Sequence, residues 1–260
     1  MRGIFLAAAL LFTAQAQALD FKPSPVVAEI FNKAQVKGTF VLYDVSANTF
    51  TGLDQKRAKT RYIPASTFKI PNSLIGLSTG AVSSVDEVLP YGGKPQFMKI
   101  FEQDMSLREA IKISNVPIYQ ELARRIGLEQ MKANVSKLGY GTAEIGPFVD
   151  KFWLEGPLKI SAVEQTQFLA RLAQDQLPFT VVAQTKTREI ARLDKGEGWT
   201  LYGKTGWTGS QKPSIGWWVG WLEQGGKVYS FALNIDMSDV NDGPIRLEVG
   251  KASLKALGLM

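Results

Sequence analysis

The sequence predicts an α+β fold, with an antiparallel sheet flanked by N- and C-terminal helices, plus a separate helical region. Three observations indicate it. A β-branched and aromatic segment lies early, at 39–45, helix-forming patterns fill the middle third, and more extended segments lie between 199 and 236. With 260 residues, 45% of them hydrophobic and 21% charged, the chain can bury a sizeable core. We therefore expect strands from both ends of the chain to complete one sheet.

The first 18 residues are predicted to be an export signal. Arg2 gives a positive start, Ile4–Phe12 is a short apolar run, and Ala16–Ala18 offers small residues for cleavage. The run is shorter than the ~20 apolar residues that a spanning helix needs, and a buried N-terminal helix is the alternative. We expect a mature chain that begins near Leu19, is exported to a bacterial periplasm and has no stable membrane anchor. Residues 19–260 should then form a single domain with two sub-regions.

The first elements of the mature chain follow from local signals. Ser24 and Pro25 suit the N-cap and the first residue of a helix, and Gly38 suits its end. Thr39–Val45 is β-branched and aromatic, which predicts a strand, and Ser46–Thr49 predicts the turn after it. A helix and a strand are thus expected at the start of the mature chain.

The next predicted helix begins near Pro64 and ends before Gly80, because glycine is favoured directly after a helix. Ile70, Leu74 and Leu77 recur at helical spacing and form an apolar stripe. This helix should therefore be buried in the core, and the polar residues of its first turn should be partly buried with it.

The middle third contains helices separated by two loops. Ser106–Glu109 and Ser161–Glu164 both fit the capping box that begins a helix. Between them, Ser114–Pro117 marks a bend between helices, because the residue before a proline avoids helical angles. Leu138–Thr142 and Phe152–Pro157 have loop composition. This part of the chain is expected to form the helical region.

After helices predicted at 161–175 and 179–191, the chain returns to extended structure and closes with a helix. The predicted strands are at 199–204, 215–222 and 227–236, and the closing helix is at 245–257. Gly225 and Gly226 predict a tight hairpin turn between the last two strands.

The sequence contains no cysteine and no histidine. A thiol nucleophile, a disulfide and a Ser-His-Asp triad are therefore excluded, and a zinc site would have only carboxylates as ligands. A serine nucleophile in this chain would need Lys, Asp, Glu or Tyr as its base. The net charge is +6, but the 30 basic residues are interleaved with 24 acidic ones. This pattern favours a solvated surface and no nucleic-acid partner.

Ser66 and Lys69 form the first candidate catalytic pair. Because they lie three residues apart in the first turn of a helix, their side chains project from the same face. Unpaired backbone N–H groups and the positive end of the helix dipole also point at Ser66. Burial would lower the pKa of Lys69, as a lysine base requires. The alternative is a surface helix start with a solvated Lys69.

Three further segments carry chemistry suited to acyl transfer. Ser114 lies at the predicted bend, where its hydroxyl could pass a proton between a base and a leaving group. Lys204–Gly206 ends a strand and offers a cation, a hydroxyl and a flat backbone. Arg246 could bind a carboxylate through its two-pronged guanidinium. The alternatives are a helix cap, a strand-end charge and a surface ion pair.

Together these segments resemble the penicillin-recognising serine acyltransferases, and most closely the class D β-lactamases. The matching segments occur in the family's order along the whole mature chain. They are Ser66–Lys69 for Ser-x-x-Lys, Ser114–Val116 for Ser-x-Val, Tyr140–Thr142 for Tyr-Gly-Asn, Trp153–Gly156 for the tryptophan loop, Lys204–Gly206 for Lys-Thr-Gly, the Trp217–Trp221 strand, and Pro244–Arg246. Thr142 replaces the family's asparagine, which leaves the role of Tyr140 open.

The resemblance implies a serine β-lactamase/transpeptidase-like fold, with the active site in the cleft between the sheet and the helical region. It also implies hydrolysis of β-lactams through an acyl-enzyme on Ser66. Lys69 is expected to react with carbon dioxide and to serve, as an N-carboxylated lysine, as the base in acylation and deacylation. Trp153 is expected to hydrogen-bond the added group. No other cofactor and no metal is implied.

The resemblance assigns roles to the other site residues. Backbone N–H groups of Ser66 and Trp207 are expected to form the oxyanion hole. Ser114, with Lys204 nearby, would deliver a proton to the leaving nitrogen. The substrate-binding residues are expected to be Val116, Tyr140, Gly206 and, on the substrate carboxylate, Thr205 and Arg246.

Three other functions are compatible with parts of the sequence. A penicillin sensor shares the fold and Ser-x-x-Lys but is attached to a membrane-spanning region. A penicillin-binding protein would act on cell-wall peptide, and a basic module would bind nucleic acid or an anionic surface. Steady turnover of a β-lactam distinguishes the hydrolase, because a sensor would give one stoichiometric burst. A homodimer is also compatible with the sequence.

Overall fold

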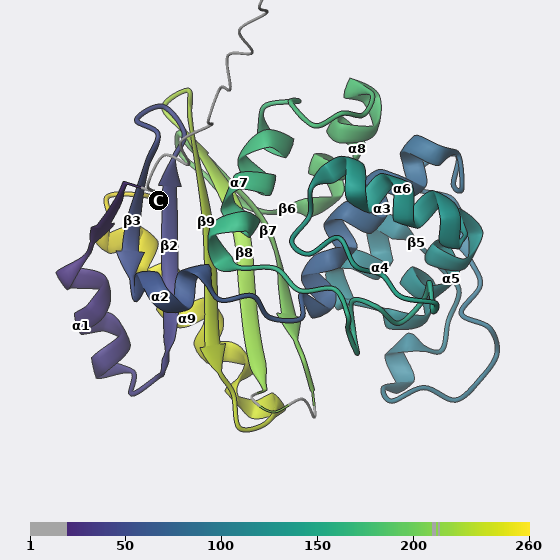
Figure 1. Cartoon of the computed structure of the whole chain (residues 1–260), viewed down its shortest axis with the longest axis horizontal. Coiled ribbons are helices and arrows are strands. Elements are labelled where there is room, and N and C mark those ends of the chain that lie inside the picture. Colours follow the sequence, from purple (N-terminus) through teal and green to yellow (C-terminus); the bar gives the residue numbers. More distant parts are fainter. Residues whose placement is uncertain (1–19, 210–211, 213) are drawn as a thin grey trace, which may run out of the picture.

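The computed structural model describes residues 20–209, 212 and 214–260. The predicted export signal at 1–18 lies outside these residues. Within them, a seven-stranded sheet has the order β1-β3-β2-β9-β8-β7-β6, and most helices gather beside its β7 side (Figure 1). The α+β class predicted from the sequence is confirmed.

The sheet combines strands from both ends of the chain. The strands are β1 (Phe21–Pro23), β2 (Gly38–Asp44), β3 (Thr49–Leu53), β6 (Arg192–Gly196), β7 (Trp199–Trp207), β8 (Ile215–Gln224) and β9 (Lys227–Asp236), with β4 (Val88–Leu89) and β5 (Met105–Ser106) paired separately. Neighbours in the large sheet are antiparallel except β1 and β3, which run parallel. The predicted antiparallel sheet is therefore correct apart from its β1 edge.

Helices cover both faces of this sheet. They are α1 (Pro25–Lys33), α2 (Gln55–Lys59), α3 (Lys69–Thr79), α4 (Leu107–Ile113), α5 (Val116–Ile126), α6 (Leu128–Leu138), α7 (Ala162–Ala173), α8 (Val181–Ala191) and α9 (Gly243–Ala256), with 3-10 turns η1 (Ala65–Phe68), η2 (Lys99–Phe101) and η3 (Val240–Asp242). Figure 1 shows α7 in front of the sheet and α9 behind it. No helix in the described part of the chain is long and apolar enough to cross a membrane.

Strand β8 separates two hydrophobic cores. Because side chains alternate along a strand, Trp217 and Trp221 enter the core shared with the helical region. Trp218 and Leu222 enter the second core, beneath α1 and α9. All four side chains are completely buried. The sheet is thus packed on both faces, and its β7 side adjoins the helical region.

Local signals located most of the elements. Strand β9 has the predicted bounds, whereas β7 and β8 continue beyond their predicted ends. Both predicted capping boxes are present, at Ser106 and Ser161. Six short elements were not predicted from the sequence, each of five residues or fewer: strands β1, β3, β4, β5 and β6, and helix α2.

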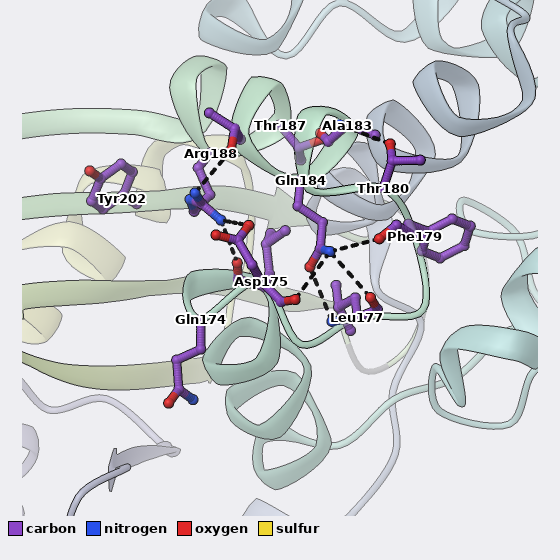
Figure 2. Close-up of polar contacts among 12 residues, drawn as sticks. Gln174, Asp175, Leu177, Phe179, Thr180, Ala183, Gln184, Thr187, Arg188 and Tyr202 are labelled. Atoms are coloured by element: carbon purple, nitrogen blue, oxygen red, sulfur yellow. Dashed lines mark hydrogen bonds and ion pairs between the residues drawn. The ribbon is translucent and has the colours of Figure 1, made fainter.

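The connection between α7 and α8 is fixed by one buried glutamine (Figure 2). Gln184 donates from Nε2 to the carbonyls of Leu177 and Phe179, at 3.2 and 3.0 Å, and its Oε1 accepts the Leu177 N–H at 3.0 Å. Arg188, one turn later, donates to the Asp175 carboxylate. Because the donor and acceptor groups of this buried side-chain amide are paired with the loop backbone, Gln184 fixes the conformation of the loop. It thereby orients α8, which leads directly into β6.

Candidate active site

Ser66 and Lys69 meet at the junction of η1 and α3. Ser66 lies within the 3-10 turn, Lys69 is the first residue of α3, and the Lys69 Nζ donates a hydrogen bond to Ser66 Oγ at 2.9 Å. Thr67 braces the turn by donating from Oγ1 to the Pro64 carbonyl at 2.8 Å. Pro71 is tolerated because it lies in the first turn of α3. The contact that the spacing predicted is present, in a tighter 3-10 first turn.

The surroundings of Lys69 disfavour the charged form of its amine. The side chain is 0% exposed, and its Nζ lies 5.2 Å from the centroid of the Tyr119 ring. Burial first, and the charge of Lys204 second, hold the pKa of Lys69 well below its ordinary value. In its neutral form this amine has a lone pair that can accept the Ser66 proton.

Lys204 lies on β7, beyond the point where β6 stops pairing. Strand β6 pairs with β7 only as far as Tyr202, so one edge of Gly203–Trp207 is unpaired within the described sheet. The Lys204 side chain is 5% exposed, and its Nζ donates to the Thr205 carbonyl at 3.1 Å. Burial first and Arg246 second lower the pKa of Lys204 to about 7. A cation whose charge changes near neutral pH thus adjoins a free backbone edge.

Gly206 brings β7 against the turn that carries Ser66. A Cβ at Gly206 would lie 3.0 Å from the Pro64 carbonyl oxygen and 3.2 Å from the Thr67 amide nitrogen. Only glycine allows the strand to approach this closely. Half-buried Arg246, from α9, donates from Nη1 to the Gly206 carbonyl. The strand edge, the turn and the guanidinium are therefore assembled beside Ser66.

Ser114 lies at the predicted bend, between α4 and α5. It caps α4 with φ 63° and ψ 34°, a left-handed conformation that costs about 1–3 kcal/mol outside glycine. Asn115 caps α5 through its side chain, and half-buried Val116 is the first residue of that helix. One turn later, the Tyr119 ring faces Lys69. Tyr119 therefore brings α5, whose start carries Ser114 and Val116, against the catalytic pair.

Trp153 is completely buried next to the candidate base. Its ring stacks on Phe68 with centroids 5.5 Å apart and an interplanar angle of 22°, and Phe68 directly precedes Lys69. Among residues 20–209, 212 and 214–260, the Trp153 Nε1 has no hydrogen-bond acceptor. A buried donor without a partner costs about 1–3 kcal/mol, so this N–H indicates where an acceptor would be stabilised.

Tyr140 departs from its predicted contact with substrate. It is 1% exposed, packs edge-on against Phe68 at 5.6 Å, and its hydroxyl donates to Gln165 Oε1 at 3.2 Å. Burial thus leaves Tyr140 no surface with which to touch a substrate, and we correct it to a supporting residue behind Ser66. Thr142, in place of the family's asparagine, accepts the Lys159 N–H at 3.1 Å and holds the loop.

Three contacts around the catalytic pair were not predicted from the sequence. Gln165, from α7, donates to Thr67 Oγ1 at 2.9 Å and braces η1 from behind. Tyr119 covers Lys69, and its hydroxyl lies 2.9 Å from Ser73 Oγ. Helical spacing from Val116 offers a signal for Tyr119. No local pattern links Gln165 to Thr67, which lies 98 positions away.

Trp207, the predicted second oxyanion donor, is the last residue of β7. It pairs with Gly216 of β8, and its indole N–H donates to Ser214 Oγ at 2.8 Å. Its backbone follows Gly206 directly and so lies beside the Ser66 turn. Within the described residues, no group of three or more acidic side chains could hold a metal ion.

Comparison with known proteins agrees with this arrangement. Residues 32–255 match the penicillin binding protein transpeptidase domain family. Beta-lactamase OXA-5 of Pseudomonas aeruginosa is 41% identical over 233 residues, which are 88% of this chain and 87% of that protein. Beta-lactamase OXA-48 of Klebsiella pneumoniae is 36% identical over 225 residues, which are 86% of this chain and 85% of that protein.

Two solved structures share the fold over nearly their whole length. The class D β-lactamase FUS-1 (OXA-85) of Fusobacterium nucleatum subsp. polymorphum has a TM-score of 0.88 and 44% identity, and covers 91% of this chain and 98% of its own. The class D β-lactamase YbXI from Nostoc has a TM-score of 0.87 and 41% identity, with 90% and 99% covered. Since sequence and structure agree over this extent, the chain belongs to the penicillin-binding transpeptidase family and, within it, to the class D serine β-lactamases.

Proposed function

We propose that this chain hydrolyses β-lactam antibiotics through an acyl-enzyme on Ser66, with N-carboxylated Lys69 as the base for both half-reactions. The observation that carries the proposal is the buried, neutral Lys69 amine 2.9 Å from Ser66 Oγ. The absence of histidine from the sequence supports it, because the base cannot be the imidazole of a Ser-His-Asp triad and Lys69 is the candidate base that contacts Ser66 Oγ. The names of the curated and solved relatives support the substrate class.

The surroundings of Lys69 suit carboxylation, because carbon dioxide adds to an uncharged amine. Burial lowers the pKa of Lys69 and so favours the uncharged amine, and the Lys204 cation nearby would favour an anionic product. The Trp153 Nε1, buried without an acceptor among the described residues, offers a donor to the added carboxylate. When bound, that group supplies an anionic oxygen base in place of the amine nitrogen.

In the proposed acylation step, Ser66 Oγ attacks the β-lactam carbonyl carbon and its proton passes to the Lys69 side chain. The carbonyl oxygen takes negative charge, which the backbone N–H groups of Ser66 and Trp207 stabilise. The ring C–N bond then breaks, and Ser114 protonates the leaving nitrogen. Ser114 recovers a proton from the Lys69 side chain, which took it from Ser66, so this base is free again for the second half-reaction. The Lys204 cation nearby keeps its own proton and favours this transfer electrostatically.

The substrate is proposed to lie along the unpaired edge of β7. Thr205 and Arg246 hold its carboxylate through a hydroxyl and a guanidinium. Gly206 leaves space above the strand, and Val116 lines the opposite wall. In deacylation, the Lys69 side chain removes a proton from water, whose oxygen attacks the ester carbonyl. The bond between that carbon and Ser66 Oγ then breaks, the proton passes from Lys69 to Ser66 Oγ, and the product acid leaves. We also propose export to the periplasm, which the composition of the first 18 residues supports.

Steady-state hydrolysis of a chromogenic cephalosporin tests this function. We expect a constant rate over many turnovers, higher with added bicarbonate than after carbon dioxide is removed. Labelling with ¹³C-bicarbonate should give a carbamate NMR signal that Lys69→Ala lacks. A single stoichiometric burst without turnover would overturn the hydrolase and indicate a sensor. Full turnover in buffer free of carbon dioxide would overturn the carboxylated base alone.

A further inference from the structure

A cavity of about 290 Å³ lies beside the catalytic strand and shares Lys204 and Thr205 with the site described above. Its other walls come from the ends of α4 and α8, from β6 and from α9. The volume is roughly ten times the ~30 Å³ that one water molecule occupies. Small-molecule sites that take whole drug-sized ligands reach up to about 1,000 Å³, so this cavity suits a substituent instead.

The rim of the cavity is positively charged. Lys112, Arg192 and Lys251 line it, are exposed, and take part in no ion pair among the described residues. Asp194 is the single acidic side chain in the described lining. Trp218 also lines the cavity, but its side chain is completely buried. The three cations at the rim therefore favour an anionic occupant.

The inner wall of the cavity is apolar. Leu193 lies where β6 bulges between Arg192 and Asp194, and it remains 51% exposed. Its Cδ1 lies 3.3 Å from the point that a Cβ at Gly203 would occupy, so it covers the start of the free β7 edge. The other apolar lining residues are Ile111, Ile190, Leu201 and Leu247. An apolar wall below a cationic rim matches an apolar group that ends in an acid.

We propose that this cavity is a subsite for an acidic substituent carried by the β-lactam next to its ring carboxylate. The proposal rests on the proposed function, because Thr205 would hold the ring carboxylate and also lines the cavity. The apolar part of the substituent packs on Leu193, and its acid lies among Lys112 and Lys251. The enzyme then prefers β-lactams with an acidic substituent at this position over otherwise identical neutral ones.

Two cephalosporins that differ only at the end of the 3-substituent, a carboxylate in one and its primary amide in the other, test the subsite. In the unmodified enzyme, we expect kcat/KM to be about threefold to tenfold higher for the acid than for the amide. This is the effect expected of two partly exposed charge pairs. The ratio should approach 1 in Lys112→Gln/Lys251→Gln, fall below 1 in Lys251→Glu, and shrink as salt is added. Lys255→Gln, one turn further along α9 and outside the cavity, should keep the original ratio.

The possible outcomes distinguish a failure of the proposed subsite from a failure of the proposed β-lactamase function. A ratio of 1 in the unmodified enzyme, or a high ratio that persists in the lysine variants, overturns the subsite while turnover of the amide still supports β-lactam hydrolysis. Turnover of neither compound overturns both. Because Lys112 and Lys251 are exposed, their variants should fold. If the double variant does not fold, the single Lys251→Gln variant provides the same comparison.

Discussion

Lysine is among the residues least often buried, yet Lys69 is 0% and Lys204 5% exposed. Neither side chain forms an ion pair with an acid among the described residues. After burial, a cationic neighbour is what disfavours the charged form of each, Lys204 acting on Lys69 and Arg246 acting on Lys204. Burial and like charge therefore lower both pKa values. At the residue scale, the site obtains a neutral amine beside Ser66 by desolvation rather than by pairing with a carboxylate.

Replacing Lys69 should disable both half-reactions. General-base catalysis contributes typically ~10²–10⁴-fold, so we expect Lys69→Ala to lower kcat for a good β-lactam by about 10³-fold or more. Intact-mass measurement should show whether the residual reaction stops at an acylated Ser66. Lys56→Ala, an exposed lysine on α2, serves as the matched control and should behave as the unmodified enzyme. Near-normal turnover by Lys69→Ala at saturating substrate would contradict the assigned base.

The charge of Lys204 should appear in the pH profile. Its pKa is about 7, because burial and then Arg246 disfavour the protonated form. Below this value the free enzyme holds a cation that attracts the substrate carboxylate, and above it the cation is lost. At saturating bicarbonate the anion on Lys69 would hold the Lys204 proton to higher pH. We therefore expect kcat/KM to fall about tenfold, the size of one charge-assisted hydrogen bond, on an alkaline limb that begins above pH 7. Lys204→Arg stays charged over this range and should remove the fall. If kcat/KM of Lys204→Arg fell at high pH in the same way, the fall would have to come from another group than Lys204.

At the scale of elements, predictability followed the strength of local signals. Strand β9 and both capping boxes carry alternation or paired polar residues that specify them locally. Strand β3 was missed because Gly52 interrupts its pattern. A Cβ there would lie 2.0 Å from the Phe40 carbonyl oxygen, a contact that only the tertiary structure reveals. Strand β6 has no buried face, so no alternation marks it.

The residues of the site differ in the same way, since some have a local sequence signal and others do not. The Ser66–Lys69 contact follows from helical spacing, and the bend at Ser114 follows from the proline after it. The brace from Gln165 to Thr67, by contrast, joins α7 to η1 and has no local signature. The burial of Tyr140 is equally non-local, because it depends on Phe68 and Phe168 packing on its ring. Motifs therefore predict which residues gather, and packing decides which of them a substrate can touch.

Tyr140→Phe tests whether this tyrosine supports the turn or binds substrate. Loss of the hydroxyl leaves the buried Gln165 Oε1 without its donor, which should lower the free energy of unfolding by about 1–3 kcal/mol. The KM should change little, because Tyr140 is 1% exposed. Urea unfolding and steady-state kinetics measure the two effects, with Tyr229→Phe on β9 as the control. A large rise in KM with unchanged stability would restore Tyr140 to the substrate site.

At the scale of the whole molecule, the site lies where the two regions meet. Strand β7 belongs to the sheet, whereas η1 and the starts of α3 and α5 belong to the helical region, and Gly206 sets their separation. The same large core that fixes this junction also buries Lys69. Function and stability are therefore opposed at this position, because the packing that makes the amine neutral also excludes the water that would stabilise its charge.

The opposition can be measured through the pH dependence of stability. The pKa of Lys69 is lowered in the folded chain but close to 10.4 in the unfolded chain. Below pH 10.4 the unfolded chain therefore binds a proton that the folded chain does not, so stability decreases as the pH falls from that value toward the folded-state pKa. Lys69→Met removes this penalty. In buffer free of carbon dioxide, it should be more stable than the unmodified protein by about 1–4 kcal/mol at pH 7, and by less at pH 9.

Bicarbonate should reverse part of that difference. Carboxylation occurs on folded Lys69, so added bicarbonate should raise the unfolding midpoint of the unmodified protein by mass action and leave that of Lys69→Met unchanged. Lys56→Met, at an exposed position, controls for the change of side chain and should respond to bicarbonate as the unmodified protein does. If Lys69→Met were the less stable protein without carbon dioxide, burial of the lysine would not be costly. If bicarbonate shifted both proteins equally, its effect would be that of a salt, and carboxylation of Lys69 would lose its support.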